Sequence, residues 1–453
     1  MKTKWNRLLA AVLCTCMLLT PLSARAVEID PEIQAEFDRL IAAGAGDILD
    51  QFLNGLPEDV RNALVAAEEA KYAAPTTSGG EATPGSGSCG VGLDWSLEAG
   101  TLTVTGSGEM FDFRPGRPAP WYDSRDSITA VTLEEGVTTI GNRAFADCTN
   151  LKTLTLPQKL TAIGDSALEN STALQELRLP GSLESIGWSA FAGCTELTWL
   201  QIPGTVRYLG GFAFDGCTRL STAAVPESVT AVEIGTFRNC TALVDVRLPQ
   251  NVTLIAPEAF SGCEQLRQVT LPESVTEIGS RAFAHCTGLK SASLPLNLET
   301  IGPEAFSGCT ALSDLSIPGS VRSIGDGAFR DCQALENLLL PQGLTEVGNY
   351  VFRGCTGLRA VILPTTLERI GRYAFSYCQK LETVNIPASV TEIDSEAFSY
   401  TGMWSVNFLG DAPTVASNAF RGTQTKAYYP TTAQGWTRKT AINYGGSLTW
   451  EAV

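Results

Sequence analysis

A 23-residue repeat is the feature that most constrains the fold of this chain. Ten of the 13 cysteines form one series, in which neighbours are 23 residues apart except for a first gap of 46 that Ser171 divides equally. The series is Cys148, Cys194, Cys217, Cys240, Cys263, Cys286, Cys309, Cys332, Cys355 and Cys378, and Thr401 continues it. A fixed period of this length predicts a solenoid, because one coil is too small to bury its own apolar face and stacking completes the core.

The unit at residues 286–308 shows how one coil can be built. Leu289, Ala292 and Leu294 alternate as the inward side of a short parallel strand, and Pro295 ends the strand because it lacks an N–H donor. A phenylalanine lies three residues before almost every cysteine position, on the far side of the predicted core. We therefore expect a right-handed solenoid of about twelve coils, each with one short parallel strand.

The only histidine, His285, lies directly before Cys286 and raises the possibility of a Cys–His nucleophile pair. The same position in most other repeats holds glycine, asparagine or aspartate, which are the residues that tolerate a left-handed turn. We interpret His285 as a solvated turn residue beside a cysteine that belongs to the core, so no such pair is expected.

Three interpretations compete for the cysteine series. Zinc binding is disfavoured, because it needs convergent thiolates such as C-x-x-C pairs and these cysteines are one coil apart. Disulfides between neighbouring coils fit the expected coil spacing, but stacked side chains would point in parallel and oppose the bond geometry. The favoured interpretation is a ladder of buried free thiols that act as small apolar side chains. Cys89 lies outside the series, and either a free thiol or a local pairing is open for it.

The repeat resembles that of the BspA-like, or treponemal-type, leucine-rich repeat family of bacterial surface proteins. The string SVTEIGSRAFAHCTGL at 274–289 recurs as GVTTIGNRAFADCTNL at 136–151 and SVTEIDSEAFSYTGM at 389–403. The resemblance covers about residues 89–453 and implies a leucine-rich repeat solenoid with β-rich caps, in proteins associated with adhesion and host or microbial interaction. Two departures are the coil with Leu168 and Ser171, and a one-residue slip between Phe398 and Phe420 that we interpret as the start of a terminal cap.

The ends of the chain differ from the repeat in composition. A basic start, an apolar run and a small-x-small site predict a secretory leader, and an acidic segment with helical periodicity follows it. Residues 89–113 alternate like a β-hairpin around Ala99–Gly100. The expected organisation is a leader at 1–26, a helical acidic segment at 27–74, a flexible linker at 75–88, a β-rich cap at 89–130, the repeat array at 131–409 and a C-terminal cap at 410–453.

The charge balance limits the partners of this protein. The formal net charge is -16, and removal of the leader with its four basic residues and no acidic one would make it -20. Such a surface repels phosphate backbones, so nucleic acid is not an expected partner. With no second apolar span and no C-terminal sorting signal, we expect a secreted or cell-surface protein that binds an extracellular protein or a glycan. How it would be anchored to a cell, and whether it forms oligomers, is open.

Candidate binding residues stand out against mostly small, polar side chains at the outward strand positions, five and seven residues after each cysteine position. The first set surrounds an outward tryptophan and comprises Glu176, Arg178, Trp199, Gln201, Asp245 and Arg247. Tryptophan flanked by arginines has the composition of an interaction hot spot. The alternative is a solvated face with one stray aromatic residue. We expect the site on the concave sheet of the stack.

A second candidate set consists of the tyrosines Tyr350, Tyr373, Tyr377 and Tyr400, which occupy two turn positions in neighbouring coils. They suit recognition of protein or glycan surfaces, and packing onto the terminal cap is the alternative. No catalytic constellation, metal site or cofactor motif is expected, because one turn histidine cannot assemble one and the carboxylates form no recurrent pair. A sugar-cleaving hydrolase, which needs only two acids, is the enzymatic alternative. The favoured function is a non-enzymatic binding protein, and the alternative is a structural or carbohydrate-binding envelope component.

Overall fold

The computed structural model describes residues 33, 56–57, 60, 85–436 and 442–453. By its contacts the chain divides into two compact units, Met1–Thr76 and Thr77–Val453. The predicted leader at 1–26 lies outside the described residues, as do the helical segment at 27–74, apart from four isolated positions, and most of the linker at 75–88. The fold described here is therefore that of the second unit.

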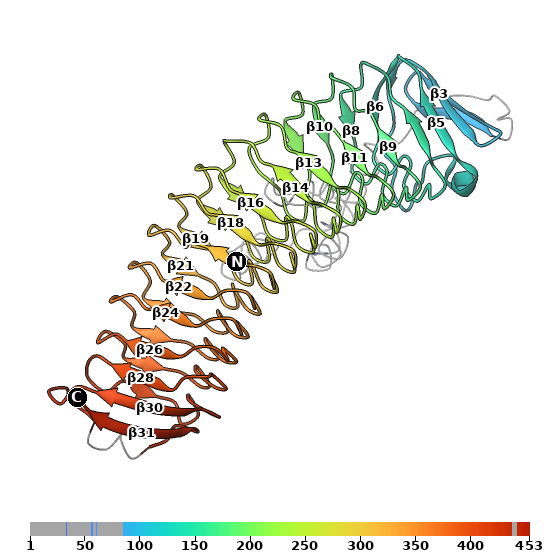
Figure 1. The fold of residues 1–453 in the computed structure, drawn as a ribbon. Coiled ribbons are helices and arrows are strands. Elements are labelled where there is room, and N and C mark those ends of the chain that lie inside the picture. The colour runs from blue at the N-terminus through green and yellow to red at the C-terminus, as the bar shows by residue number, and fades with distance from the viewer. Residues whose placement is uncertain (1–32, 34–55, 58–59, 61–84, 437–441) are drawn as a thin grey trace, which may run out of the picture. The chain divides into compact units, whose positions relative to one another are not determined.

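The second unit is a β-solenoid of about 14 coils of roughly 23 residues, so the predicted leucine-rich repeat solenoid is confirmed (Figure 1). One parallel strand per coil follows the cysteine position, and we call these strands the first series. They are β5 (Ala130–Leu133), β7 (Thr153–Thr155), β9 (Glu176–Leu177), β11 (Trp199–Leu200), β13 (Thr222–Ala224), β14 (Asp245–Arg247), β16 (Gln268–Thr270), β18 (Ser291–Ser293), β20 (Asp314–Leu315), β22 (Asn337–Leu339), β24 (Ala360–Ile362), β26 (Thr383–Ile386), β28 (Ser405–Phe408), β30 (Gln424–Tyr429) and β31 (Ser447–Ala452).

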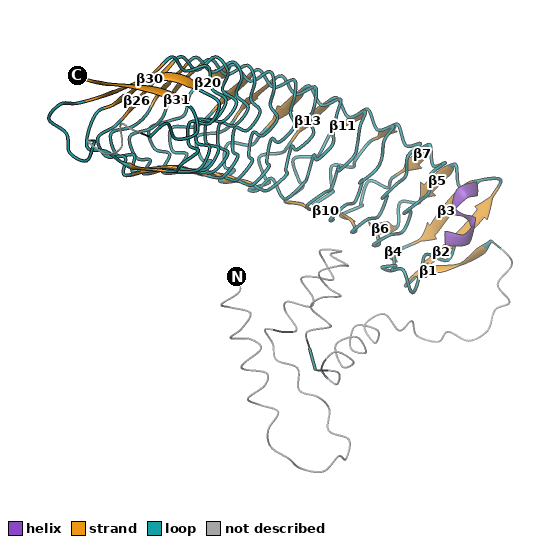
Figure 2. Ribbon diagram, turned by 90° about the horizontal axis from the view of Figure 1, so that it is seen from below, coloured by secondary structure: helices purple, strands orange, loops and turns teal. Residues whose placement is uncertain are grey.

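Most coils also contain a second strand, which the sequence analysis did not predict. These second-series strands are parallel to one another and lie along the opposite long edge of the stack (Figure 2). They are β4 (Gly108–Glu109), β6 (Val137–Ile140), β8 (Ala162–Ile163), β10 (Ser185–Ile186), β12 (Tyr208–Leu209), β15 (Leu254–Ile255), β17 (Glu277–Ile278), β19 (Thr300–Ile301), β21 (Ser323–Ile324), β23 (Glu346–Val347), β25 (Arg369–Ile370), β27 (Glu392–Ile393) and β29 (Thr414–Val415). Most are two residues long, too short for an alternating pattern to reveal them.

The N-terminal end of the stack is closed by antiparallel strands. β1 (Ser86–Gly90) pairs with β2 (Leu93–Glu98), β2 pairs with β3 (Thr101–Gly106), and β3 continues in parallel to β5. The turn between β2 and β3 lies at Ala99–Gly100, where both residues have positive φ, so the predicted hairpin is confirmed. A 3-10 helix (Tyr122–Ser127) precedes β5, and β1 starts three residues before the expected cap boundary at residue 89.

Two ladders of side chains fill the core between the strand series. From Phe191 to Phe420 successive phenylalanine rings stack with centroids 5.3–5.7 Å apart. From Cys194 to Cys378 each thiol donates a hydrogen bond of 3.1–3.3 Å to the carbonyl of the residue 26 positions earlier. All described cysteines, including Cys89, are buried and free, which supports the free-thiol interpretation over disulfides.

The one-residue slip after Phe398 does not end the stack. Thr383 pairs with Ser405, a spacing of 22 residues, yet the rings of Phe398 and Phe420 still stack at 5.3 Å. Gln424 then pairs with Ser447, which restores the spacing of 23. The turn before β28 therefore absorbs the missing residue, and the coils continue through the slip.

Two backbone positions are left-handed in most coils. The position before the cysteine has φ between +56° and +75° from Asp147 to Gly422, as the residue types predicted. A second position, five residues before the cysteine, has φ between +51° and +64° and was not predicted. It holds serine, glutamate, arginine and aromatic residues as well as glycine, so composition gave no signal for it.

Candidate functional site

Trp199 lies on the outward face of the first series. Its side chain is 46% exposed, and β11 places it directly beside Glu176 of β9 in the parallel register. Arg178 and Gln201 occupy the next outward positions of the same two coils and are exposed. Side chains alternate along each strand, so Leu177 and Leu200 point into the core. The neighbouring polar and aromatic side chains therefore point to solvent.

Asp245 and Arg247 do not contact Trp199 in the ladder. They lie at the two ends of β14, which pairs with β13, and the coil of Thr222 and Ala224 separates them from the tryptophan. The first-series ladder is interrupted between β11 and β13 in the part of the chain that the structure describes. The six predicted residues thus share one face. Only four of them form a compact group, namely Glu176, Arg178, Trp199 and Gln201.

A shallow depression of about 390 Å³ adjoins Trp199 and was missed by the sequence analysis. Its lining residues are Gln175, Glu176, Glu196, Thr198, Arg219 and Ala242. Arg219 forms an ion pair with Glu196, whereas Arg178 and Arg247 take part in none of the ion pairs of the described residues. The face therefore offers an aromatic side chain, two guanidinium groups without carboxylate partners among the described residues, and a polar hollow.

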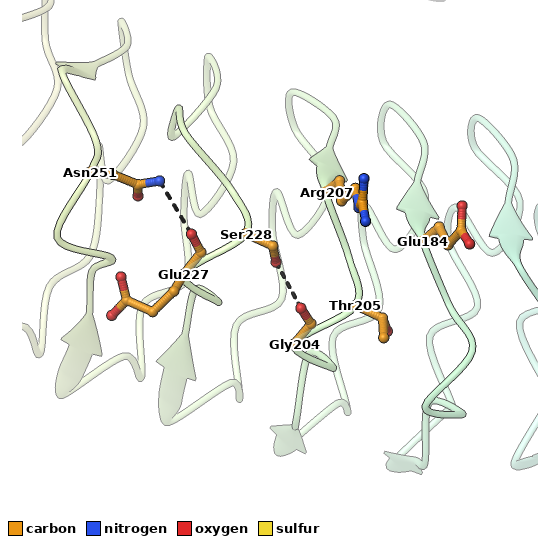
Figure 3. A pocket seen from close by; sticks show the side chains of 7 residues that line it. All are labelled: Glu184, Gly204, Thr205, Arg207, Glu227, Ser228 and Asn251. Carbon is orange, nitrogen blue, oxygen red and sulfur yellow. Dashed lines mark hydrogen bonds between the residues drawn. The ribbon is translucent and has the colours of Figure 1, made fainter.

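A larger depression, of about 540 Å³, lies on the turns that join the two strand series (Figure 3). It is lined by Glu184, Gly204, Thr205, Arg207, Glu227, Ser228 and Asn251. Ser228 donates to the Gly204 carbonyl at 3.0 Å and Asn251 donates to the Glu227 carbonyl at 3.2 Å. These bonds join one coil to the next, so the depression is mainly a groove between successive turns.

The tyrosines form two stacked pairs. The rings of Tyr350 and Tyr373 are 5.0 Å apart with a 9° angle between their planes, and those of Tyr377 and Tyr400 are 5.0 Å apart at 16°. Tyr373 donates a hydrogen bond of 3.3 Å to Glu396, and the charge of Glu396 is the main cause that raises the pKa of this phenol. Within each pair the two rings pack on each other along the stack, and the side chains stay partly exposed.

His285 is not part of a nucleophile pair. It is exposed, with φ of +59°, and its backbone N–H donates to Ser307 at 2.7 Å. The adjacent Cys286 is fully buried and donates its thiol hydrogen to the Phe260 carbonyl at 3.1 Å. The two side chains therefore lie on opposite sides of the chain, in solvent and in the core.

Burial also governs the chemistry of the other thiols. Loss of solvent raises the pKa of Cys89, Cys148 and Cys194 to about 12, against a usual value of 9.0. Among the described residues no three histidine, cysteine or acidic side chains are grouped as a metal site would require. The helices of that part of the chain include none with the length and apolarity to cross a membrane.

Comparison with known proteins agrees with this architecture. A model of the BspA type leucine rich repeat region, which comprises six copies of the repeat, matches residues 120–244, 231–355 and 299–427, more than half of the chain. A leucine-rich repeat protein from Bacteroides ovatus is similar in structure, with a TM-score of 0.65, 23% identity, and coverage of 79% of this chain and 98% of its own. This likeness shows the fold.

A leucine rich cell surface protein from Faecalibacterium prausnitzii is 28% identical, with a TM-score of 0.42 and coverage of 73% of this chain and 96% of its own. Curated proteins yield no match to the sequence.

Proposed function

Because the chain belongs to the BspA-type leucine-rich repeat family, we propose that it is an exported, non-catalytic protein that binds another protein through the first-series face around Trp199. The observation that carries the proposal is the tryptophan itself, large and 46% exposed at an outward strand position. Tryptophan and arginine are enriched among the residues that dominate binding energy at interfaces. Unpaired Arg178 can add a charge-assisted hydrogen bond to a partner.

The proposed export rests on the leader-like residues 1–26, with a basic start, an apolar run and Ala24–Ala26 as a cleavage site. An extracellular location suits the acidic surface, which keeps a long repeat protein soluble. Adhesion and microbial interaction, which the resemblance implied, are the corresponding biological roles.

The absence of catalysis is also part of the proposal. The one histidine lies in an exposed turn, and burial raises the pKa of Cys194, Cys217 and Cys240, so these thiols are not thiolates at neutral pH. A rigid stack with a long, shallow polar face is suited to contact a partner over a wide area.

The test begins with residues 27–453, immobilised and screened against purified bacterial surface and host extracellular proteins. For a partner that binds saturably, Trp199→Ala should weaken the affinity by at least about 2 kcal/mol, or roughly thirtyfold. Trp404→Ala is the matched control, because this tryptophan also lies beside the first series and is 61% exposed. The Trp199 site is refuted if the two variants bind equally well.

A further inference from the structure

Two stacked tyrosine pairs lie on one turn edge of the C-terminal coils, away from the Trp199 face. Tyr350 and Tyr373 occupy the position five residues before the cysteine, and Tyr377 and Tyr400 occupy the position directly before it or its equivalent. Tyr350, Tyr377 and Tyr400 are 38%, 40% and 38% exposed. Because Ser376 donates its N–H to the Tyr373 carbonyl at 3.1 Å, one tight turn connects the two rows.

The backbone gives no reason for tyrosine at these positions. Their φ values are +60°, +55°, +62° and +56°, in the left-handed region where a side chain costs about 1 kcal/mol. Most coils place glycine, asparagine or aspartate before the cysteine, as the local conformation favours. Tyr377 and Tyr400 are therefore held there against the local preference, and such outliers point to a role in binding.

One ring face of each pair has no aromatic ring of the preceding coil stacked on it. The equivalent position before Tyr350 is Gly327, and the one before Tyr377 is Gly354. Since glycine has no side chain, no ring or chain from that position covers these faces. The Tyr350–Tyr373 pair is thus a flat apolar platform, backed by a second ring and open toward one end of the stack, whereas the Arg353 guanidinium lies over the Tyr377 ring.

Two unpaired positive charges lie beside the platforms. The Arg353 guanidinium lies 5.6 Å from the centre of the Tyr377 ring, and the exposed Arg372 adjoins Tyr373 in the chain. Neither arginine belongs to an ion pair of the described residues. Of the neighbouring carboxylates, Glu396 pairs with Arg421 at 3.4 Å and Asp331 with Arg330 at 3.5 Å, whereas Asp326 only accepts hydrogen bonds from Asn349, including one from its side-chain amide at 3.0 Å.

We propose that Tyr350, Tyr373, Tyr377 and Tyr400, with Arg353 and Arg372, form a binding site for an acidic saccharide. The C–H face of a sugar ring packs on an open tyrosine face, and a guanidinium binds the sugar carboxylate with two parallel hydrogen bonds. A neutral sugar would leave both guanidinium groups unpaired, so the site favours uronic or sialic acid units. This site is independent of the proposed protein-binding face.

The probes are soluble polygalacturonate, hyaluronate and polysialic acid, titrated calorimetrically into residues 27–453. Fully methyl-esterified polygalacturonate is the matched neutral ligand, because it keeps the chain and removes its charge. We expect saturable binding of at least one acidic polymer, which weakens with salt, and no binding of its neutral counterpart. Failure of all three acidic polymers to bind, or equal binding of the ester, would overturn the proposal.

Two double variants locate the site. Arg353→Gln with Arg372→Gln, and Tyr350→Asn with Tyr377→Asn, should each weaken binding about tenfold or more, whereas Tyr208→Ala, which removes an exposed tyrosine elsewhere, should not. Asparagine suits the left-handed turns, so the tyrosine variant should fold, and thermal unfolding checks this. Unchanged saccharide binding in both double variants would contradict the site. So would a result in which the variants lose binding to a protein but not to a saccharide. Trp199→Ala should leave saccharide binding intact, which separates this test from the previous one.

Discussion

At the scale of single residues, Asp165 has the pKa with the clearest consequence for stability. Burial raises it from 3.8 to about 6, against the opposing effect of a hydrogen bond of 2.7 Å from the backbone N–H of Trp188. Between these pH values the folded chain holds the proton and the unfolded chain does not. The contribution of Asp165 to the free energy of unfolding therefore falls as the pH rises from about 4 to 6.

Asp165→Asn should remove that dependence. One coil earlier Asn142 accepts the backbone N–H of Asp165 at 2.6 Å, so an amide fits this position. We expect the variant to be more stable by about 1–3 kcal/mol at pH 7 and nearly unchanged at pH 4. Denaturant unfolding at both pH values measures this, and an equal gain at both would show that ionisation is not the cause.

The ladder position of Cys263 tests the thiol hydrogen bond. Its thiol donates to the Phe237 carbonyl at 3.2 Å, and in another coil Ser171 donates to the Phe145 carbonyl at 3.0 Å. Cys263→Ala would leave that carbonyl with only the backbone N–H of Cys240, at 3.2 Å, and should cost about 0.5–1.5 kcal/mol. Cys263→Ser should cost less, because its hydroxyl can donate. Urea unfolding compares the two variants, and an alanine variant as stable as serine would show that the bond contributes nothing.

At the scale of structural elements, the phenylalanine ladder holds neighbouring coils together. Phe283 is fully buried and its ring is 5.3 Å from those of both Phe260 and Phe306. Phe283→Ala should lower the free energy of unfolding by about 3–5 kcal/mol, because it leaves a cavity between two rings. Phe283→Leu should cost less, since Leu168 fills this position in its own coil. Unaltered unfolding of the alanine variant would contradict the ladder.

The second strand of each coil belongs to the same scale. A strand of two residues makes too few hydrogen bonds to be stable alone. β17, β19 and β21 form because equivalent residues of neighbouring coils lie side by side. The interruption near Val232, where only a bridge to Ile255 forms, coincides with Glu233 at a position that is glycine in most coils. Stacking, more than local propensity, decides where these strands are formed.

At the scale of the whole solenoid, the ends need protection because a terminal coil has a neighbour on one side only. In the C-terminal cap the ring of Trp436 lies 4.8 Å from Phe408, 5.2 Å from Tyr429 and 5.5 Å from Trp450. At the other end Trp121 stacks on Phe145 at 5.7 Å and so begins the aromatic column. At both ends a tryptophan thus packs against the last aromatic side chains of the core.

Trp436→Ala should open the C-terminal end before the middle of the stack. Repeat proteins gain stability from neighbouring coils, so the loss is expected to be local. Hydrogen exchange should accelerate in β30 and β31 and stay nearly unchanged in β16 and β18. Equal acceleration throughout would mean that the solenoid unfolds as one cooperative unit.

The candidate sites show the limits of sequence reasoning. The outward position of Trp199 followed from its place in the repeat, because alternation along a strand depends only on residue number. The hollow beside it combines Gln175, Thr198, Arg219 and Ala242 from four successive coils, and no local pattern identifies such a set. Likewise, the tyrosine slots were visible in the repeat, but the free Arg353 and Arg372 could be recognised only once the partners of neighbouring carboxylates were known.

The sequence alone determined the solenoid, its period, the buried phenylalanine and cysteine positions and one left-handed turn, because these depend on interactions that every coil repeats. The tertiary structure decided the second strand series, the second left-handed position, the donation of each thiol to a carbonyl 26 residues away and the charges that remain unpaired. Those features depend on which side chains of different coils lie next to each other. The packed backbone sets these contacts, and the order of residues along the chain encodes them only indirectly.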